Sequence, residues 1–76
     1  MKELLEIMAR SLVDDPESVT VTEEQKEDLL VLKLHVAKED MGKVIGKSGR
    51  IARALRQVLN AAASREKIKV AVDIDD

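Results

Sequence analysis

Hydrophobic residues recur at helical spacing over the first part of the chain. Between residues 2 and 13, charged residues separate the apolar positions Leu4, Leu5, Met8 and Leu12. This spacing predicts an amphipathic helix over residues 2–13. The Asp14-Asp15-Pro16 segment should end this helix, because the residue before a proline avoids the helical region.

Two segments with alternating polarity follow, and each predicts a β-strand. Residues 18–22 are rich in β-branched side chains, so we expect a short strand there and an acidic turn over residues 23–28. The next strand should cover residues 29–36 and place on one face Leu30, Leu32, Leu34 and Val36. Lys33 and His35 fall on the other face, as in a sheet that is covered on one side.

The second half of the chain predicts two helices and a final strand. A short helix over residues 38–45 precedes a glycine, a long helix covers residues 50–64, and apolar residues alternate over residues 68–74. The predicted fold is α+β with the order α-β-β-α-α-β, in which helices cover one face of a three-stranded sheet. We expect one domain over residues 1–76, because a chain of this length supports a single core.

The long helix divides into two faces when it is projected at about 100° per residue. The face expected to contact the core carries Ile51, Leu55, Val58 and Ala62. The opposite, polar face carries Arg50, Arg53, Gln57 and Asn60. Because two arginines lie in the first turns of this helix, they should be close to the glycine-containing turn before it.

That turn is the strongest candidate for function, in the segment Val44-Ile45-Gly46-Lys47-Ser48-Gly49-Arg50. Glycines at both ends of a tight turn permit positive φ and let a sugar-phosphate chain approach the backbone. Lys47 and Ser48 add a charge and a hydroxyl, and the N-terminus of the following helix favours an anion at the same place. An ATPase-type P-loop requires four residues between its glycines, whereas Gly42 and Gly46 enclose three. We therefore interpret the turn as a clamp for a nucleic-acid backbone.

Charge is distributed unevenly along the chain. The 13 basic and 15 acidic residues give a net charge of −2. Residues 42–69 nevertheless contain eight basic residues and one acid, a local charge of +7, which leaves −9 for the remainder. Such a distribution attracts a polyanion to one side of the molecule and repels it from the other.

Composition excludes several classes of function. The chain has no cysteine and no Phe, Tyr or Trp, which rules out disulfides, thiolate metal sites and base stacking on aromatic side chains. Its acidic first residues do not resemble a signal peptide, and no apolar run is long enough to span a bilayer. We expect a cytoplasmic protein without cofactor or metal. Catalysis is not expected, since the single histidine, His35, has no cysteine or second histidine nearby and no nucleophile is paired with a base.

The chain resembles a type II (bacterial) KH domain over essentially its whole length. The resemblance rests on the element order, on the glycine turn between two helices and on the sequence Arg50-Ile51-Ala52-Arg53-Ala54-Leu55-Arg56. This resemblance implies a groove that takes about four unpaired nucleotides. The RNA-binding residues that it implies are Ile45, Gly46, Lys47, Ser48, Gly49, Arg50 and Arg53, with Lys43 and Val44 as secondary candidates.

The same resemblance implies that aliphatic residues form the floor of the groove, with Val44, Ile45 and either Leu34 or Val36 as candidates, although the pattern of each of them fits ordinary core packing better. Ala52 departs from the larger aliphatic residue that many KH domains have there, and it implies a shallower floor. The implied function is low-specificity binding of single-stranded RNA in an RNA-chaperone or post-transcriptional role, and binding of DNA stays open.

The resemblance also implies a homodimer, or a heterodimer with a larger, multidomain KH-containing protein, because two weak sites gain affinity when they are joined. Small side chains at Ala54 and Ala61-Ala62-Ala63 permit close helix approach, although they equally suit helix formation and packing within the chain. The alternative function is a KH-fold protein-interaction module with little nucleic-acid binding of its own. Lys47 and the absence of an acid from the glycine turn argue against that alternative.

Overall fold

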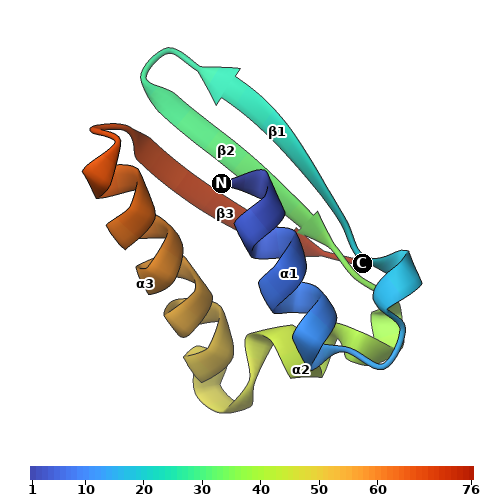
Figure 1. Ribbon diagram of the computed structural model, residues 1–76. Coiled ribbons are helices and arrows are strands. Elements are labelled where there is room, and N and C mark those ends of the chain that lie inside the picture. Colours follow the sequence, from blue (N-terminus) through green and yellow to red (C-terminus); the bar gives the residue numbers. More distant parts are fainter.

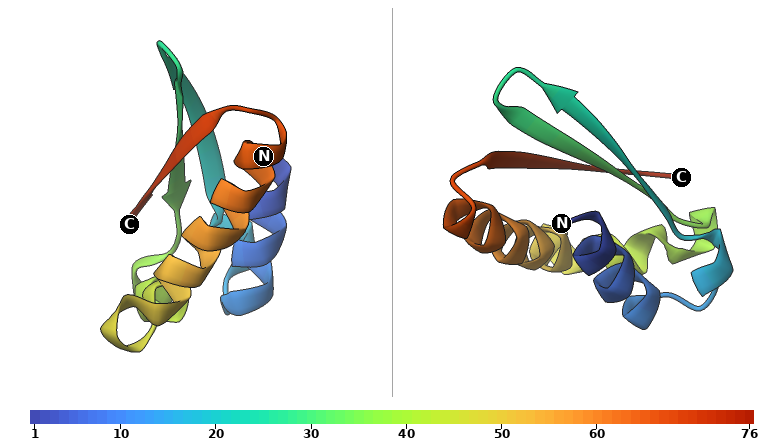
Figure 2. Two further views of the ribbon diagram at one scale, coloured as in Figure 1. Left: turned by 90° about the vertical axis from the view of Figure 1, so that its left-hand side faces the viewer. Right: turned by 45° about the horizontal axis from the view of Figure 1, so that its top comes forward.

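A computed structural model describes residues 1–76 and confirms the predicted order of elements. Its helices and strands are α1 (Lys2–Leu12), β1 (Thr20–Lys26), β2 (Leu29–His35), α2 (Met41–Ile45), α3 (Arg50–Arg65) and β3 (Lys69–Asp75). Short 3₁₀ turns occupy Pro16–Ser18, Lys38–Asp40 and Lys47–Gly49. The helices lie together on one face of the sheet, which leaves the other face uncovered (Figures 1 and 2). None of the helices is long and apolar enough to cross a membrane.

The sheet has the strand order β1-β2-β3 and combines both kinds of pairing. β1 and β2 form an antiparallel hairpin, whereas β3 pairs with β2 in parallel. Leu32 in the central strand lies opposite Glu23 on one side and Val72 on the other. A parallel pair requires a crossover connection. Here the crossover contains α2, the glycine turn and α3, so the candidate site lies within it (Figure 1).

The expected acidic turn over residues 23–28 is wrong, because β1 continues to Lys26 and the turn contains only Glu27 and Asp28. Glu27 adopts φ +50°, which a tight two-residue hairpin turn requires. The acidic side chains are tolerated because this part of an edge strand is exposed. Glu24 also lies 3.5 Å from the ammonium of Lys33 on the adjacent strand. Cross-strand pairing therefore outweighs the low strand propensity of glutamate.

The core lies between the sheet and the helices. It contains Leu5, Ala9, Val19, Val21, Leu32, Leu34, Val36, Val44, Leu59 and Val72. The predicted faces of β2 are confirmed, since Leu32 and Leu34 are fully buried while Lys33 and His35 are exposed.

The predicted core face of α3 is wrong by about one residue. The residues that it buries are Ala52, Leu55, Leu59 and Ala63, whereas Val58 is 45% exposed and Ala62 is only partly covered. Apolar residues extend over a wider arc of this helix than the sheet can cover, so apolarity alone did not define the contact. The small side chain of Ala52 is used for packing against the rest of the domain, where it is 4% exposed.

Candidate nucleic-acid interface

The glycine turn joins α2 to α3 through three residues with positive φ. Gly46 ends α2 at φ +75° and ψ 171°, and Gly49 precedes α3 at φ +74° and ψ 16°. Between them, Ser48 takes the left-handed conformation at φ 57° and ψ 25°. The side chains of Lys47 and Ser48 are exposed at the tip of the turn. The predicted tight turn with exposed polar side chains is therefore present.

The two glycines are required for different reasons. A Cβ atom on Gly46 would lie 2.6 Å from Cγ1 of Ile51, so the absence of a side chain lets the turn rest on the first turn of α3. A Cβ atom on Gly49 would meet nothing closer than Nη1 of Arg53, at 3.7 Å. Gly46 thus makes room for the protein itself, whereas Gly49 supplies a backbone conformation and an open approach.

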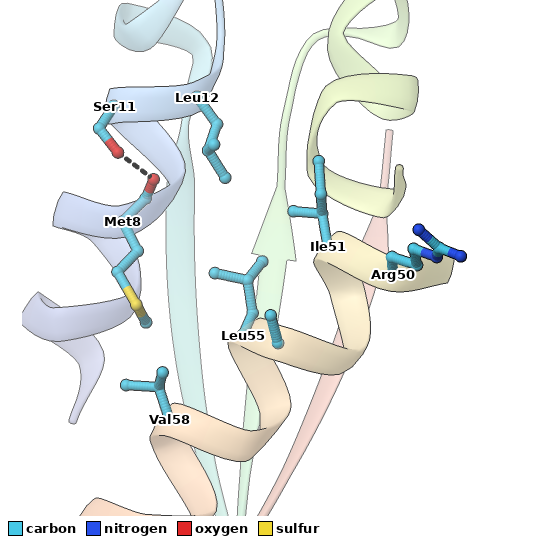
Figure 3. A pocket seen from close by; sticks show the side chains of 8 residues that line it. Met8, Ser11, Leu12, Arg50, Ile51, Leu55 and Val58 are labelled. Carbon is cyan, nitrogen blue, oxygen red and sulfur yellow. Dashed lines mark hydrogen bonds between the residues drawn. The ribbon is translucent and has the colours of Figure 1, made fainter. Parts of the chain in front are cut away.

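Arg53 holds the turn from the side of α3. Its Nη1 donates a hydrogen bond of 3.0 Å to the backbone carbonyl of Ser48. This bond places the guanidinium beside the turn, as expected from the sequence, and gives it a bracing role that the sequence did not reveal. Arg50 lies one turn earlier and is exposed, with its side chain directed away from α1 (Figure 3).

Lys43 is engaged in an ion pair on the other side of the turn. Its ammonium lies 3.1 Å from Oδ2 of Asp14 and 3.6 Å from Oδ1 of Asp40. The hydrogen bond with Asp14 and the charges of both carboxylates raise the pKa of Lys43 above its usual value. A cation neutralised in this way contributes less to anion binding, and the structure gives no support to Lys43 as a phosphate contact.

Asp40 is a structural residue that the sequence analysis did not single out. It is the one buried charged residue, at 2% exposure, and it accepts hydrogen bonds from the backbone N–H groups of Asp14 and Asp15 at 3.2 and 3.0 Å. Burial raises the pKa of Asp40, but these two hydrogen bonds and the ammonium of Lys43 outweigh burial, so the pKa lies below its usual value. Asp40 therefore fastens the segment after α1 to the start of α2.

Most of the expected groove floor is part of the core instead. Val44, Leu34 and Val36 are each fully buried, so none of them is available to a ligand. Ile45 is partly buried and packs at the margin of the core, which leaves it as the accessible member of the set. Side chains in a sheet centre and a short helix are covered by their own neighbours, and their sequence pattern does not distinguish a groove floor from a core.

Basic side chains after the turn have no acidic partner. The cations without an ion pair in the turn, α3 and the start of β3 are Lys47, Arg50, Arg53, Arg56, Arg65, Lys67 and Lys69. The side-chain cations that form ion pairs are Arg10, Lys26, Lys33 and Lys43. Arg56 donates to the backbone carbonyl of Val72, at 3.4 Å, and so reaches the edge strand β3. The positive charge predicted for this region is not neutralised within the chain.

α3 presents two exposed flanks on either side of its buried residues. The polar flank is a stripe at spacings of three and four residues, and it comprises Arg50, Arg53, Gln57, Asn60 and Ser64, all of them exposed. The apolar flank faces α1 and comprises Ile51, Ala54, Val58, Ala61 and Ala62. Together with Leu4, Met8 and Leu12 of α1, the apolar flank lines two hollows of about 350 and 490 Å³. Arg50 also lines the first hollow, which Figure 3 shows from close by.

The family of the chain follows from a comparison with protein families. The model of the KhpA/KhpB KH domain matches residues 2–74. The chain belongs to this family. The match includes every helix and all but the last residue of β3, so the family extends over the turn and both flanks of α3.

Several relatives have a similar length and are at least half identical to this chain. "RNA-binding protein KhpA" of Clostridium perfringens is 60% identical over 74 residues, which cover 97% of this chain and 99% of the relative. The protein of the same name from Clostridium acetobutylicum is 57% identical with the same coverage. That of Treponema pallidum is 53% identical over 99% of this chain and 94% of its own length. These names describe RNA-binding proteins of a non-enzymatic KH-domain family, and the chain is not an enzyme.

Solved structures with the same fold include part of the protein Era. Era of Aquifex aeolicus bound to GDP·AlF4⁻ superposes with a TM-score of 0.64 at 18% identity. Era in complex with MgGDPNP and nucleotides 1506–1542 of 16S ribosomal RNA gives a TM-score of 0.55 at 23% identity. Each match covers 96% of this chain and 28% of the Era chain. At these identities the similarity establishes the fold alone.

Proposed function

We propose that this chain binds single-stranded RNA by its backbone, at the glycine turn and the N-terminal half of the polar flank. The observation that carries the proposal is the series of cations after the turn, none of which has an acidic partner. Proteins retain unpaired cations in such a cluster when an external polyanion supplies the opposite charge. The relatives named RNA-binding protein KhpA favour RNA as that polyanion.

The parts of the site have separate roles in this proposal. Gly49 lets a phosphate approach the backbone, while Gly46 lets the turn rest on Ile51 of α3. Lys47 and Arg50 supply charge, and Ser48 offers a hydroxyl. Arg53 keeps the turn in shape and adds charge beside it. Ile45 is the accessible apolar contact next to the turn.

Phosphate contacts carry no sequence information, so binding is broad and depends on salt. Single-stranded DNA is a second ligand that the same contacts would accept. A cytoplasmic role as an RNA chaperone or post-transcriptional regulator agrees with such broad binding.

The first test is a fluorescence-anisotropy titration of a mixed-sequence single-stranded RNA at two salt concentrations. It compares the native chain with the double variant Lys47→Asp/Ser48→Asp. Aspartate tolerates the left-handed conformation of Ser48, so the turn keeps its shape. We expect the native chain to bind with a negative salt slope and the folded variant to lose binding.

A matched control separates the site from overall charge. Lys2→Asp/Thr22→Asp changes the net charge equally, but it adds one acid at the N-terminus of α1 and another opposite Lys33 on the uncovered sheet face. This control should bind as the native chain does. Equal binding by all three proteins would reject the turn as the site. A native chain that does not bind at all would favour the protein-interaction alternative.

We also propose that a second copy of the chain, or a larger KhpB-like KH protein, covers the apolar flank. Four of the five exposed large hydrophobic side chains lie on α1 and α3, at Leu4, Ile7, Leu12 and Val58. A domain of this size buries a smaller fraction of its surface than a larger domain does, so an uncovered apolar face of this kind favours association. Ala54, Ala61 and Ala62 permit close approach there, whereas Ala63 is buried in the core and does not contribute.

Analytical ultracentrifugation tests this association with two variants. Val58→Asp puts a charge in the centre of the apolar flank, and Ile68→Asp changes a similarly exposed residue at the far end of α3. We expect the native chain and Ile68→Asp to sediment as dimers and Val58→Asp as a monomer. A native chain that is monomeric at high micromolar concentration would contradict the homodimer.

A further inference from the structure

α3 ends and β3 begins at the opposite end of α3 from the glycine turn (Figure 1). A hollow lies there. It has a volume of about 580 Å³. Its polar lining comes from Asn60 and Ser64 of α3 and from Lys67 and Lys69, and its apolar lining includes Ile68 and Val70. Half of its eight lining residues are hydrophobic and half are polar or charged, which suits a ligand that has both an apolar ring and charged groups.

The hollow continues the polar flank. Asn60 and Ser64 are the last two residues of the stripe that starts at Arg50 beside the turn, and both line the hollow. A ligand that follows this stripe from the turn therefore arrives at the hollow. The stripe contains no acidic side chain, so nothing along it repels a phosphate backbone.

Charge at the hollow also lacks a partner within the chain. Neither Lys67 nor Lys69 forms an ion pair, and Lys67 is held at φ +59° in the turn before β3. Ile68, between these two lysines, is 40% exposed. Unpaired cations beside an exposed apolar side chain match a nucleotide, which has an anionic backbone and a base with two apolar faces.

We propose that this hollow binds an additional nucleotide of the strand held at the glycine turn, with its base between Ile68 and Val70 and its phosphates at Lys67 and Lys69. The inference rests on the proposed RNA binding at the turn and extends it. The amide of Asn60 can both donate to and accept from a base edge. Fourteen residues separate Arg50 from Ser64, about 21 Å along the helix axis. At a stacked spacing of about 3.4 Å this corresponds to about six nucleotides, more than the four of a KH groove.

The test compares a four-nucleotide with an eight-nucleotide single-stranded RNA across several salt concentrations. We expect the longer RNA to bind with a salt slope steeper by about 1.4, since two more phosphates are contacted at about 0.7 each. The variant Lys67→Asn/Lys69→Gln should remove that difference and leave the four-nucleotide RNA unaffected. Asparagine suits the left-handed conformation at position 67, so this variant keeps the fold.

Two further variants separate charge from base contact. Lys2→Gln/Lys38→Asn removes the two remaining unpaired lysines, which lie outside the flank, and should leave both slopes unchanged. Asn60→Ala should weaken binding of the eight-nucleotide RNA severalfold. It should not change the binding of an eight-nucleotide RNA whose end nucleotides are abasic. If the native chain binds the two RNAs with equal salt slopes, and Lys47→Asp/Ser48→Asp binds neither RNA, the proposal for the hollow is wrong and the proposal for the turn stands. If neither RNA binds the native chain, both proposals fail.

Discussion

The two flanks of α3 differ in chemistry although they belong to one helix and are both exposed. The apolar flank, with Ile51 and Val58, lacks a covering segment, whereas the polar flank, with Arg50 and Arg53, lacks a neutralising acid. Between the two flanks, the buried residues of α3, such as Leu59, pack against the sheet and α1. The two flanks therefore suit different kinds of partner, an apolar protein surface for one and a polyanion for the other.

The largest expected effect is on the free energy of unfolding, and it distinguishes a buried residue of α3 from a residue of its apolar flank. Leu59 is fully buried, so Leu59→Ala should lower the free energy of unfolding by about 3 to 4 kcal/mol through lost burial and a cavity. Val58→Ala should cost less than about 1 kcal/mol in the monomer, because nearly half of that side chain is already in water. Urea denaturation at a dilute protein concentration measures both. Equal losses would mean that the flank is part of the core, as the helical projection of the sequence predicts.

The glycines of the turn form the next comparison, since each meets a different flank. Gly46→Ala directs its new methyl group at Ile51 of the apolar flank and forces a φ that only glycine adopts with ease, so the loss should be about 2 to 3 kcal/mol. Gly49→Ala directs its methyl group toward Arg53 of the polar flank, without a clash, and should cost about 1 kcal/mol. Thermal denaturation ranks the two variants. The reverse order would show that the turn does not rest on Ile51.

Much of this architecture could be predicted from the sequence, because period and polarity define it locally. The alternation of apolar residues over residues 29–36 predicts a strand, and their helical spacing near the N-terminus predicts a helix. Both patterns depend only on neighbouring residues, and both predictions are confirmed. The rotation of α3 was missed since Val58 and Leu59 are equally apolar and only the position of the sheet distinguishes them. The length of β1 was missed for a similar reason, because its pairing with β2 is a tertiary contact.

The charges of the candidate site show the same limit. Lys43 and Lys47 are both lysines and lie only four residues apart. Lys43 forms an ion pair with Asp14, which is distant in the chain, whereas Lys47 forms none. Sequence predicts where positive charge is concentrated. Which cations stay available depends on the fold, as does the role of Asp40, whose partners lie 25 and 26 residues away.

A smaller effect distinguishes these two lysines. Lys47→Gln should reduce the salt slope of RNA binding by about 0.7 and leave the free energy of unfolding unchanged, since the side chain is exposed and unpaired. Lys43→Gln should do the opposite, because it removes a partner of Asp14 and Asp40, which already neutralise the charge of Lys43. Anisotropy titrations and urea denaturation on the same samples check both. A reduced slope for Lys43→Gln would place it in the interface after all.

The smallest effect concerns pH and the hydrogen bonds by which Asp40 fastens the segment after α1 to the start of α2. Its pKa in the folded state lies below the value of about 3.9 for an unfolded chain, so the unfolded state binds protons first as pH falls. Its contribution is therefore fully present above about pH 4 and is lost as pH falls through the folded pKa. Asp40→Asn should destabilise the protein at pH 7, and its difference from the native chain should shrink at pH 3.

Denaturation of both proteins at pH 7, 5 and 3 measures this dependence. A difference that stays constant with pH would mean that the hydrogen bonds to Asp14 and Asp15 need no charge on Asp40. The salt slope of RNA binding provides the complementary measurement. Since Asp40 lies before the turn and touches neither flank of α3, Asp40→Asn should leave this slope unchanged. A changed slope would show that the segment before the turn controls the availability of the cations after it, and the two sides of the turn would then act as one unit.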